Sequence, residues 1–345
     1  MGETKRRAFK HFVGIDVSKD TLDIALMSDT KLLEHCKIAN EPLAIKSFLT
    51  HLKSIENLKL SNCLFGLEFT GIYGNYLLEA LTKAKANVVQ EHPLQIKKSL
   101  GLTRGKNDKV DSIRIGQFLR RYDHAVNLWE PKRKVIQQLA TLSTLRARMV
   151  NHSQALTKPL KEDIGFLSKE FTLLNKQLCA DSIVALKSDI AKIDLEIQNV
   201  CNSDERVMRL MELALSVPCI GPVTAVQIIV TTNEFKDIST PQKFACYSGV
   251  APFQFASGSS VYKPARVSFI ANKKMKTLLH ICAVSAIRTV PDIKAYYLKK
   301  TLVEGKHKML VLNAVRFKLI TRVFACVMNN RLYQTTYTLN DNYDK

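Results

Sequence analysis

The sequence lacks closely spaced cysteine pairs. Its eight cysteines are scattered along the chain, mostly in apolar surroundings, and no two of them form a C-x-x-C motif. A disulfide framework or a zinc site needs paired or clustered thiols, so this spacing argues against both. We expect reduced, buried thiols in a cytosolic protein.

Long hydrophobic runs are also missing. No stretch is long enough to span a bilayer, and no apolar segment follows the N-terminal Met-Gly-Glu-Thr-Lys-Arg-Arg. We therefore expect neither a signal peptide nor a membrane partner. The 345 residues, 46% of them hydrophobic, suit a globular protein of two or three domains.

Acidic residues are few, with 31 Asp and Glu against 51 Lys and Arg, so the net charge is +20. An excess of this size indicates a polyanionic partner, most simply nucleic acid. Residues 242–345 hold 17 basic and 4 acidic residues, whereas residues 151–241 hold 9 and 12. The basic ends of the chain are the expected nucleic-acid surfaces, and charge alone carries no sequence preference.

Two apolar runs near the N-terminus each end in a carboxylate. Phe12 to Ile15 precede Asp16, and the run from Asn62 ends in Glu68. Strand-like runs alternate here with helical periods, which predicts an α/β domain around one sheet. The predicted strands cover residues 12–15, 22–26, 31–39, 62–68 and 87–90, and the predicted helices cover 42–55 and 73–84. Strand ends at one edge of such a sheet form a crevice, where the two acids would face each other. The competing interpretation is that Asp16 opens a turn and Glu68 caps a helix.

A Gly-rich basic loop then leads into a predicted helix that carries two more acids. Asp108 and Asp111 are three residues apart and share one face of its first turn. Acids are common at helix N-termini because the dipole favours them. Lys106 and Lys109 interleave with these acids, as phosphate-contacting lysines would around a metal site. Together with Asp16, the acids fit a cluster for Mg²⁺ or Mn²⁺, which prefer carboxylate oxygens.

Glycine nearly vanishes from residue 131 to residue 212, where apolar residues recur every three or four positions. This period predicts long helices, the second coiled-coil-like. Its stripe consists of Ile183, Leu186, Ile190, Ile193 and Ile197. Such a stripe serves either helix packing within the chain or self-association, and the pattern leaves both open. We expect Thr157-Lys-Pro159 to break or bend the first helix.

The segment from Leu213 to Val230 predicts two helices around a tight Pro-x-x-Gly-Pro turn. Gly221 permits the reversal and Pro222 starts the second helix. This helix-hairpin-helix pattern binds a DNA phosphate through turn amides. A Ser-Gly loop at Ser257 follows, and amphipathic basic helices are predicted over 276–287 and 306–328. The basic residues expected to contact nucleic acid in this part are Lys263, Arg266, Lys273 and Lys274.

The order of these motifs resembles the IS110 family of insertion-sequence transposases, which includes the Piv-type DNA invertases. Gly14-Ile-Asp16, Glu68-Phe-Thr-Gly-Ile-Tyr73 and Lys106-Asn-Asp108-Lys-Val-Asp111 resemble the motifs of its DEDD domain. Val217 to Ala225, Tyr247 to Pro252 and Ser257-Gly258 resemble its C-terminal transposase domain. Cys219 stands where a Gly is usual, and Ala256-Ser257-Gly258-Ser259 replaces the common Ser-Ser-Gly-Gly.

The resemblance implies an RNase H-like, RuvC-like α/β catalytic domain over residues 11–130 and a coiled-coil-like oligomerisation region over 131–212. It implies a mainly α transposase domain, with the helix-hairpin-helix and the serine loop, over 213–330. Asp16, Glu68, Asp108 and Asp111 would hold Mg²⁺ or Mn²⁺. Ser257, with Ser259 as second choice, would attack DNA and form a phosphoserine link. The implied partners are DNA at the element ends and target, a structured guide RNA, and further copies of the chain in a dimer or tetramer.

Two other functions compete with the recombinase. A structure-specific nuclease of the RuvC type would use the same four acids with water as the nucleophile. A basic nucleic-acid-binding protein with a decayed site would have lost some of the acids, and all four are present.

Overall fold

The computed structural model describes residues 9–69, 71–99, 107–162, 165–257, 261–268 and 270–335. The chain splits into two compact units, Met1–Pro131 and Lys132–Lys345.

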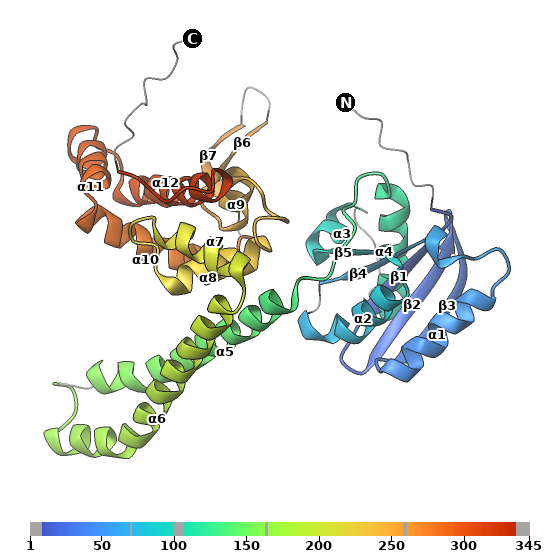
Figure 1. Cartoon of the computed structure of the whole chain (residues 1–345), viewed down its shortest axis with the longest axis horizontal. Coiled ribbons are helices and arrows are strands. Elements are labelled where there is room, and N and C mark those ends of the chain that lie inside the picture. The colour runs from blue at the N-terminus through green and yellow to red at the C-terminus, as the bar shows by residue number, and fades with distance from the viewer. Residues whose placement is uncertain are drawn as a thin grey trace, which may run out of the picture. The chain divides into compact units, whose positions relative to one another are not determined.

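The first unit is built on a five-stranded mixed sheet with the order β3-β2-β1-β4-β5 (Figure 1). Its strands are β1 (His11–Val17), β2 (Thr21–Ser28), β3 (Lys31–Ala39), β4 (Cys63–Glu68) and β5 (Asn87–Glu91). β2 pairs antiparallel with β1 and β3, whereas β4 pairs parallel with β1 and β5. All strands predicted from the sequence are present, so the mixed α/β character of this unit is confirmed.

Helices cover both faces of this sheet. α1 (Pro42–Ser54) and α2 (Asn75–Lys83) share a core with Val13 and Ile15 of β1. α4 (Asp108–Tyr122) packs on the opposite face with Phe12. Because both faces are buried, β1 reads as a nearly continuous apolar run until Asp16. The unit also holds α3 (Pro93–Ser99), which the sequence did not predict, and 3-10 turns at Leu60–Asn62 and Gly71–Gly74.

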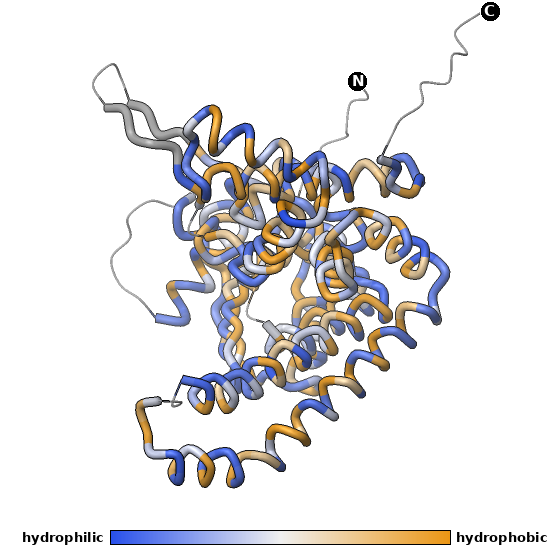
Figure 2. Tube along the Cα trace, turned by 90° about the vertical axis from the view of Figure 1, so that its left-hand side faces the viewer, coloured by the Kyte–Doolittle hydropathy of each residue, from blue (hydrophilic) through white to orange (hydrophobic). Residues whose placement is uncertain are grey.

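The second unit begins with a long helical hairpin of α5 (Lys134–Glu162) and α6 (Lys169–Asn202), along which hydrophobic and polar residues alternate (Figure 2). The predicted α6 stripe packs within the chain, since Ile193 is buried and Ile197 joins a cluster with Leu139 of α5. The predicted break is wrong, because α5 continues through Pro159 to Glu162. Pro159 lacks the N–H that would bond the Ala155 carbonyl oxygen, and only three helical residues follow it.

The rest of the second unit is largely helical (Figure 1). It contains α7 (Glu205–Leu215), α8 (Pro222–Thr232), α9 (Pro241–Tyr247), α10 (Lys273–Thr289), α11 (Pro291–Leu298) with a π-helical turn at Lys299–Val303, and α12 (Lys308–Met328). Its main core joins Leu213 of α7, Phe244 of α9 and Phe324 of α12. The sequence predicted only a loop at Ser257. In the structure β6 (Pro252–Ser257) and β7 (Val261–Val267) form a two-stranded hairpin there. Helix α11 was not predicted.

A left-handed turn follows α8, where residues 233–235 have φ of 50°, 58° and 64°. Residues other than glycine seldom adopt this conformation. Glu234 is only 3% exposed, and its carboxylate lies 2.6 Å from an Arg133 nitrogen and 3.0 Å from Arg206 Nε. Arg133 also donates two hydrogen bonds, of 2.8 and 2.9 Å, to Asp204. These ion pairs fasten the start of α5 to α7 and to the turn after α8.

All eight cysteines are free thiols, four of them buried and four half-buried. No helix within the described residues is both long and apolar enough to cross a membrane.

Candidate active site

Asp16 and Glu68 end neighbouring strands of the first unit. In the parallel β1–β4 register Ile15 lies opposite Leu67, so the next residues, Asp16 and Glu68, occupy adjacent positions. Side chains alternate between the faces of a sheet. Asp16 therefore lies on the same face as Phe12, which α4 covers.

Helix α4 comes unusually close to β1 because glycines leave room for it. A Cβ added to Gly14 would lie 2.1 Å from the Ser112 carbonyl oxygen and 2.3 Å from the Gly116 nitrogen. The helix start is capped by the Asn107 side chain, which accepts a 2.8 Å hydrogen bond from the Val110 N–H. This approach brings the first turn of α4, with its two acids, towards Asp16.

The charges of the acids meet at Asp16. Its carboxyl is half-buried, and its pKa is raised to about 6, first by burial and then by the charges of Asp111, Asp108 and Asp23. Like charges raise the pKa of a carboxyl because each disfavours ionisation of the others. The fold therefore concentrates negative charge at the end of β1, a place that a cation would stabilise.

Two of these acids are paired with cationic side chains. Lys37 Nζ lies 3.3 Å from Asp108 Oδ2, and an Arg114 nitrogen donates a 2.8 Å hydrogen bond to Asp111 Oδ1. Within the described residues, no three His, Cys, Asp or Glu side chains are arranged to hold an ion. The donors nonetheless fit Mg²⁺ in kind, since all are carboxylate oxygens, and in charge.

Sequence reasoning missed three residues beside this cluster. Asp23 lies opposite Asp16 across β1–β2 and is only 5% exposed. Lys37 Nζ lies 3.0 Å and His35 Nε2 3.4 Å from the Asp23 carboxylate. The available signal was an Asp within the apolar run of β2, where a buried charge needs partners.

The predicted nucleic-acid residues are spread over both units. Lys109 is exposed on α4, and Lys106 lies outside the described residues. In the second unit Lys273 is exposed at the start of α10, and Arg266 is exposed on β7. Lys263 also lies on β7, opposite Phe255 of β6.

The turn between α7 and α8 differs from its predicted geometry. Gly221 has φ of −88° and ψ of 170°, which any residue adopts, and a Cβ there would meet nothing within 4 Å. The left-handed residue is instead Cys219, with φ of 69°. The reversal that was ascribed to Gly221 is thus made by Cys219, the position at which the family usually has glycine.

Ser257 is the last residue of β6 and pairs with Val261 of β7. Gly258 and Ser259 lie outside the described residues. Ser257 belongs to the second unit and the four acids to the first, so their meeting at one phosphate remains a prediction.

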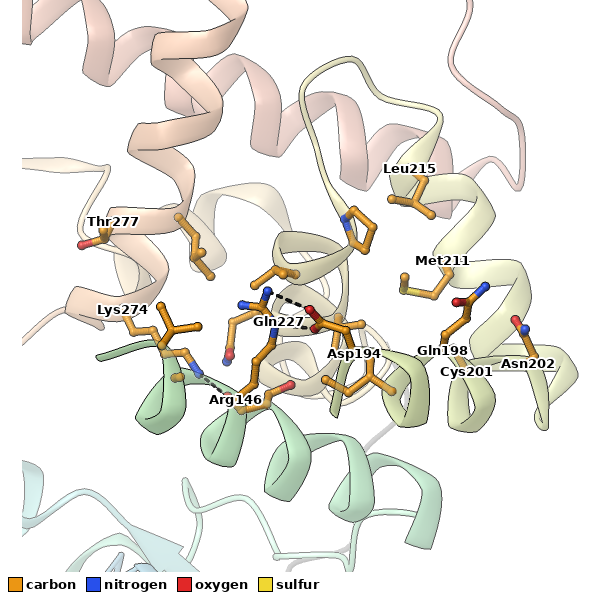
Figure 3. A pocket seen from close by; sticks show the side chains of 18 of the residues that line it. Arg146, Asp194, Gln198, Cys201, Asn202, Met211, Leu215, Gln227, Lys274 and Thr277 are labelled. Carbon is orange, nitrogen blue, oxygen red and sulfur yellow. Dashed lines mark hydrogen bonds and ion pairs between the residues drawn. The ribbon is translucent and has the colours of Figure 1, made fainter. Parts of the chain in front are cut away.

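A cavity of about 1020 Å³ lies in the second unit, between α5, α6, α7, α8 and α10. Figure 3 shows the Arg146–Asp194 ion pair, which joins α5 to α6 at this cavity. Lys274 lines the same cavity, and its Nζ lies 3.5 Å from the Ser143 carbonyl oxygen (Figure 3). Burial, with the nearby charge of Arg146, lowers the pKa of Lys274. Lys274 is nonetheless an exposed residue, and its contact with nucleic acid stays a prediction.

Comparison with known proteins gives matches over most of the chain. A family model named DEDD_Tnp_IS110 and described as "Transposase" matches residues 13–164, and one described as "Transposase IS116/IS110/IS902 family" matches residues 211–298. The chain is 26% identical over 329 residues to the pilin gene-inverting protein of Moraxella bovis, covering 93% of this chain and 97% of that protein. The pilin gene-inverting protein of Moraxella lacunata matches to the same extent.

The solved structure of Thermus thermophilus RuvC is similar over 34% of this chain and 99% of that chain, with 12% identity and a TM-score of 0.27. The two family models, with the near full-length relatives, identify the protein. The chain belongs to the IS110 family of transposases, enzymes of DNA recombination.

Proposed function

We propose that the protein cuts and rejoins DNA strands through a phosphoserine intermediate, with Ser257 as nucleophile and a divalent metal ion held by Asp16, Glu68, Asp108 and Asp111. The observation that carries this proposal is the β1–β4 register that places Glu68 next to Asp16, together with the charges of Asp108 and Asp111 that act on the Asp16 carboxyl. The relatives named for pilin gene inversion support strand exchange as the outcome, by inversion or by transposition.

The acids of the first unit, Asp16, Glu68, Asp108 and Asp111, would hold the ion at the scissile phosphate. Bound Mg²⁺ or Mn²⁺ supplies positive charge that stabilises the phosphate as it is attacked and aligns the attacking and leaving oxygens. Asp16 and Glu68 end rigid neighbouring strands, so their spacing is set by the sheet rather than by side-chain rotation. The strand order and the crossover to β4 support a RuvC-like arrangement of this unit.

Ser257 performs the covalent step. Its Oγ forms a bond to phosphorus while the bond from phosphorus to the leaving deoxyribose oxygen breaks, and the serine proton is lost as the leaving oxygen gains one. The phosphoserine keeps the energy of the phosphodiester, so a second strand end reverses the step without a nucleotide cofactor. Lys263 and Arg266 on β7 contact flanking phosphates.

The serine and the acids belong to different units, so they act together within one subunit or across two. We assign the long α5–α6 hairpin to that assembly, in a dimer or tetramer. The net charge of +20 supports binding of DNA and of a structured guide RNA.

The test uses the purified full-length protein with a labelled plasmid that carries its gene and flanking DNA. With Mg²⁺, we expect a protein–DNA adduct that survives denaturation, and its loss in Ser257→Ala and in Asp16→Asn. Ser259→Ala is the matched control and should retain the adduct. An adduct that persists in Ser257→Ala and disappears in Ser259→Ala would move the nucleophile to Ser259.

The second candidate is a RuvC-type nuclease in which water attacks. It is favoured by the confinement of all four acids to the first unit. In that case Ser257→Ala would still cut DNA and no adduct would form with the wild type.

A further inference from the structure

A row of charged side chains crosses the sheet of the first unit. Strand registers place Glu68 beside Asp16, Asp16 opposite Asp23, and Asp23 opposite Lys37. Directly paired residues on neighbouring strands project to the same face. The row therefore runs from two predicted metal ligands, through a third carboxylate, to a lysine at its other end.

Asp23 fixes the position of this lysine. Its carboxylate is buried, and a buried charge is retained where a partner compensates it. Lys37 Nζ lies 3.0 Å from Asp23 Oδ2, while His35 Nε2 approaches the other oxygen at 3.4 Å. The side chain of Lys37 is 49% exposed, so its ammonium is tethered at one side and open to solvent on another.

Lys37 also binds a predicted metal ligand. Its Nζ lies 3.3 Å from Asp108 Oδ2, and Asp108 is 60% exposed. A divalent ion on Asp108 would repel the ammonium at this distance, so the lysine and the ion compete for this carboxylate. Asp23 would keep the released ammonium at the edge of the site.

We propose that Lys37 is a positioning residue that takes the place of the divalent ion on Asp108 and, once the ion binds, contacts a DNA phosphate next to the scissile one. The buried Asp23 is its anchor and remains outside the ion's ligand set. This inference rests on the proposed metal site. The ligand class is a phosphodiester oxygen, for which a tethered ammonium is a suitable point charge.

The experiment measures two equilibria in full-length Lys37→Met. Titration with Mn²⁺ alone, followed by calorimetry and by thermal unfolding, should show about two- to five-fold tighter binding of the ion, the range expected for removal of one exposed competing charge. In buffer with chelator the variant should unfold at a lower temperature than the wild type. In Mg²⁺ its DNA affinity should fall, with the slope of log affinity against log salt smaller by about one.

Two variants serve as controls. Lys31→Met removes a lysine at the start of the same strand and should change neither the ion affinity nor the salt slope. Lys37→Arg keeps the charge and should restore the wild-type salt slope. Asp23→Asn tests the anchor with Lys37 intact, and should lower the salt slope as Lys37→Met does.

The outcomes separate this inference from the proposed function. A wild type that shows no response to Mn²⁺ or Mg²⁺ overturns the metal site and this inference with it. If the wild type binds the ion and Lys37→Met binds it equally or more weakly, Lys37 does not take the place of the ion on Asp108. The proposed metal site would still stand. An unchanged salt slope in Lys37→Met overturns the phosphate contact.

Discussion

The two units present their proposed catalytic groups in opposite ways. In the first unit each acid lies on an element of a covered sheet or on a helix packed against it, and the spacing follows from strand register and helix contact. In the second unit Ser257 ends one strand of a two-stranded hairpin that pairs with no other strand of the described part of the chain. An isolated pair of strands has little stability of its own. We therefore expect a preformed acidic site and a serine whose position depends on what the hairpin contacts.

The two units also differ in how their charged side chains are paired. The acids near Asp16 repel one another and raise its pKa, whereas the buried Glu234 of the second unit forms ion pairs with Arg133, Arg206 and Lys236. Charge repulsion is thus kept at the site expected to bind an ion, and ion pairs elsewhere serve the fold. Four predictions test this contrast, in order of decreasing effect.

The largest effect is expected for Asp16→Asn, which removes the carboxylate at which the charges meet. We expect strand cleavage in Mg²⁺ to fall by about 10²–10³-fold, the loss typical when one group that stabilises developing charge is removed. Folding should be retained, because the substitution relieves repulsion. Cleavage of the flanking-DNA plasmid and thermal unfolding measure the two effects. Wild-type cleavage in this variant would contradict the preformed acidic site.

In the second unit Arg133→Met should destabilise by about 3 kcal/mol, because it leaves the buried Glu234 carboxylate with fewer partners. Urea unfolding measures the loss. Arg120→Met is the control from the first unit, since its partner Asp29 is exposed and such pairs contribute less than about 1 kcal/mol. Equal losses in the two variants would show that the buried network has no special role.

Gly14→Ala should destabilise the first unit by about 1–3 kcal/mol, because its Cβ would meet backbone atoms of α4 and force the helix away. Cleavage should fall as well, since α4 carries two of the acids. Gly221→Ala in the second unit is the control and should cost less than about 1 kcal/mol, as its Cβ meets nothing. Urea unfolding and the cleavage assay measure the two effects. An active Gly14→Ala protein would refute the close approach of α4 to β1.

The smallest effect concerns pH. The pKa of Asp16 is raised to about 6, above the ordinary value of 3.8 for an aspartate. Ionised Asp16 therefore destabilises the metal-free fold above pH 6, and that fold gains stability as the pH falls from 6 towards 4. Protons compete with the ion, so Mg²⁺ affinity should drop about five-fold between pH 6 and pH 5. Asp111→Asn should move this midpoint to lower pH. Calorimetric titration with Mg²⁺ across pH 5–8 measures the midpoint in the wild type and in the variant. An unchanged midpoint in Asp111→Asn would contradict the charge coupling between Asp111 and Asp16.

Much of the first unit was predictable because its signals are local. The strand that ends in Asp16 and the strand that ends in Glu68 each read directly as an apolar run closed by an acid. Asp23 and Lys37 were missed because their importance depends on pairing across strands, which a local pattern does not specify. The glycines that let α4 approach β1 gave no signal in the sequence, because the contact of Gly14 with Ser112 arises only in the folded structure.

The second unit was less predictable. Its long helices α5 and α6 followed from the three- and four-residue period, but Pro159 was expected to break or bend α5 because the pattern did not reveal how near the helix end it lay. The left-handed conformation was predicted for Gly221, since glycine adopts it at least cost. In the structure Cys219 adopts it. The β6–β7 hairpin carries Ser257 where the sequence suggested only a loop.

The sequence by itself determined the chemistry: four carboxylates after apolar runs or at a helix start, a candidate serine, and a large basic excess. Those features depend on residue type and short-range order, which the chain carries wherever it folds. Only the tertiary structure decided that Asp23 faces Asp16, that Lys37 bridges Asp23 and Asp108, and that α4 lies against β1. Such relations arise from strand register and helix packing, which join residues that are distant along the chain.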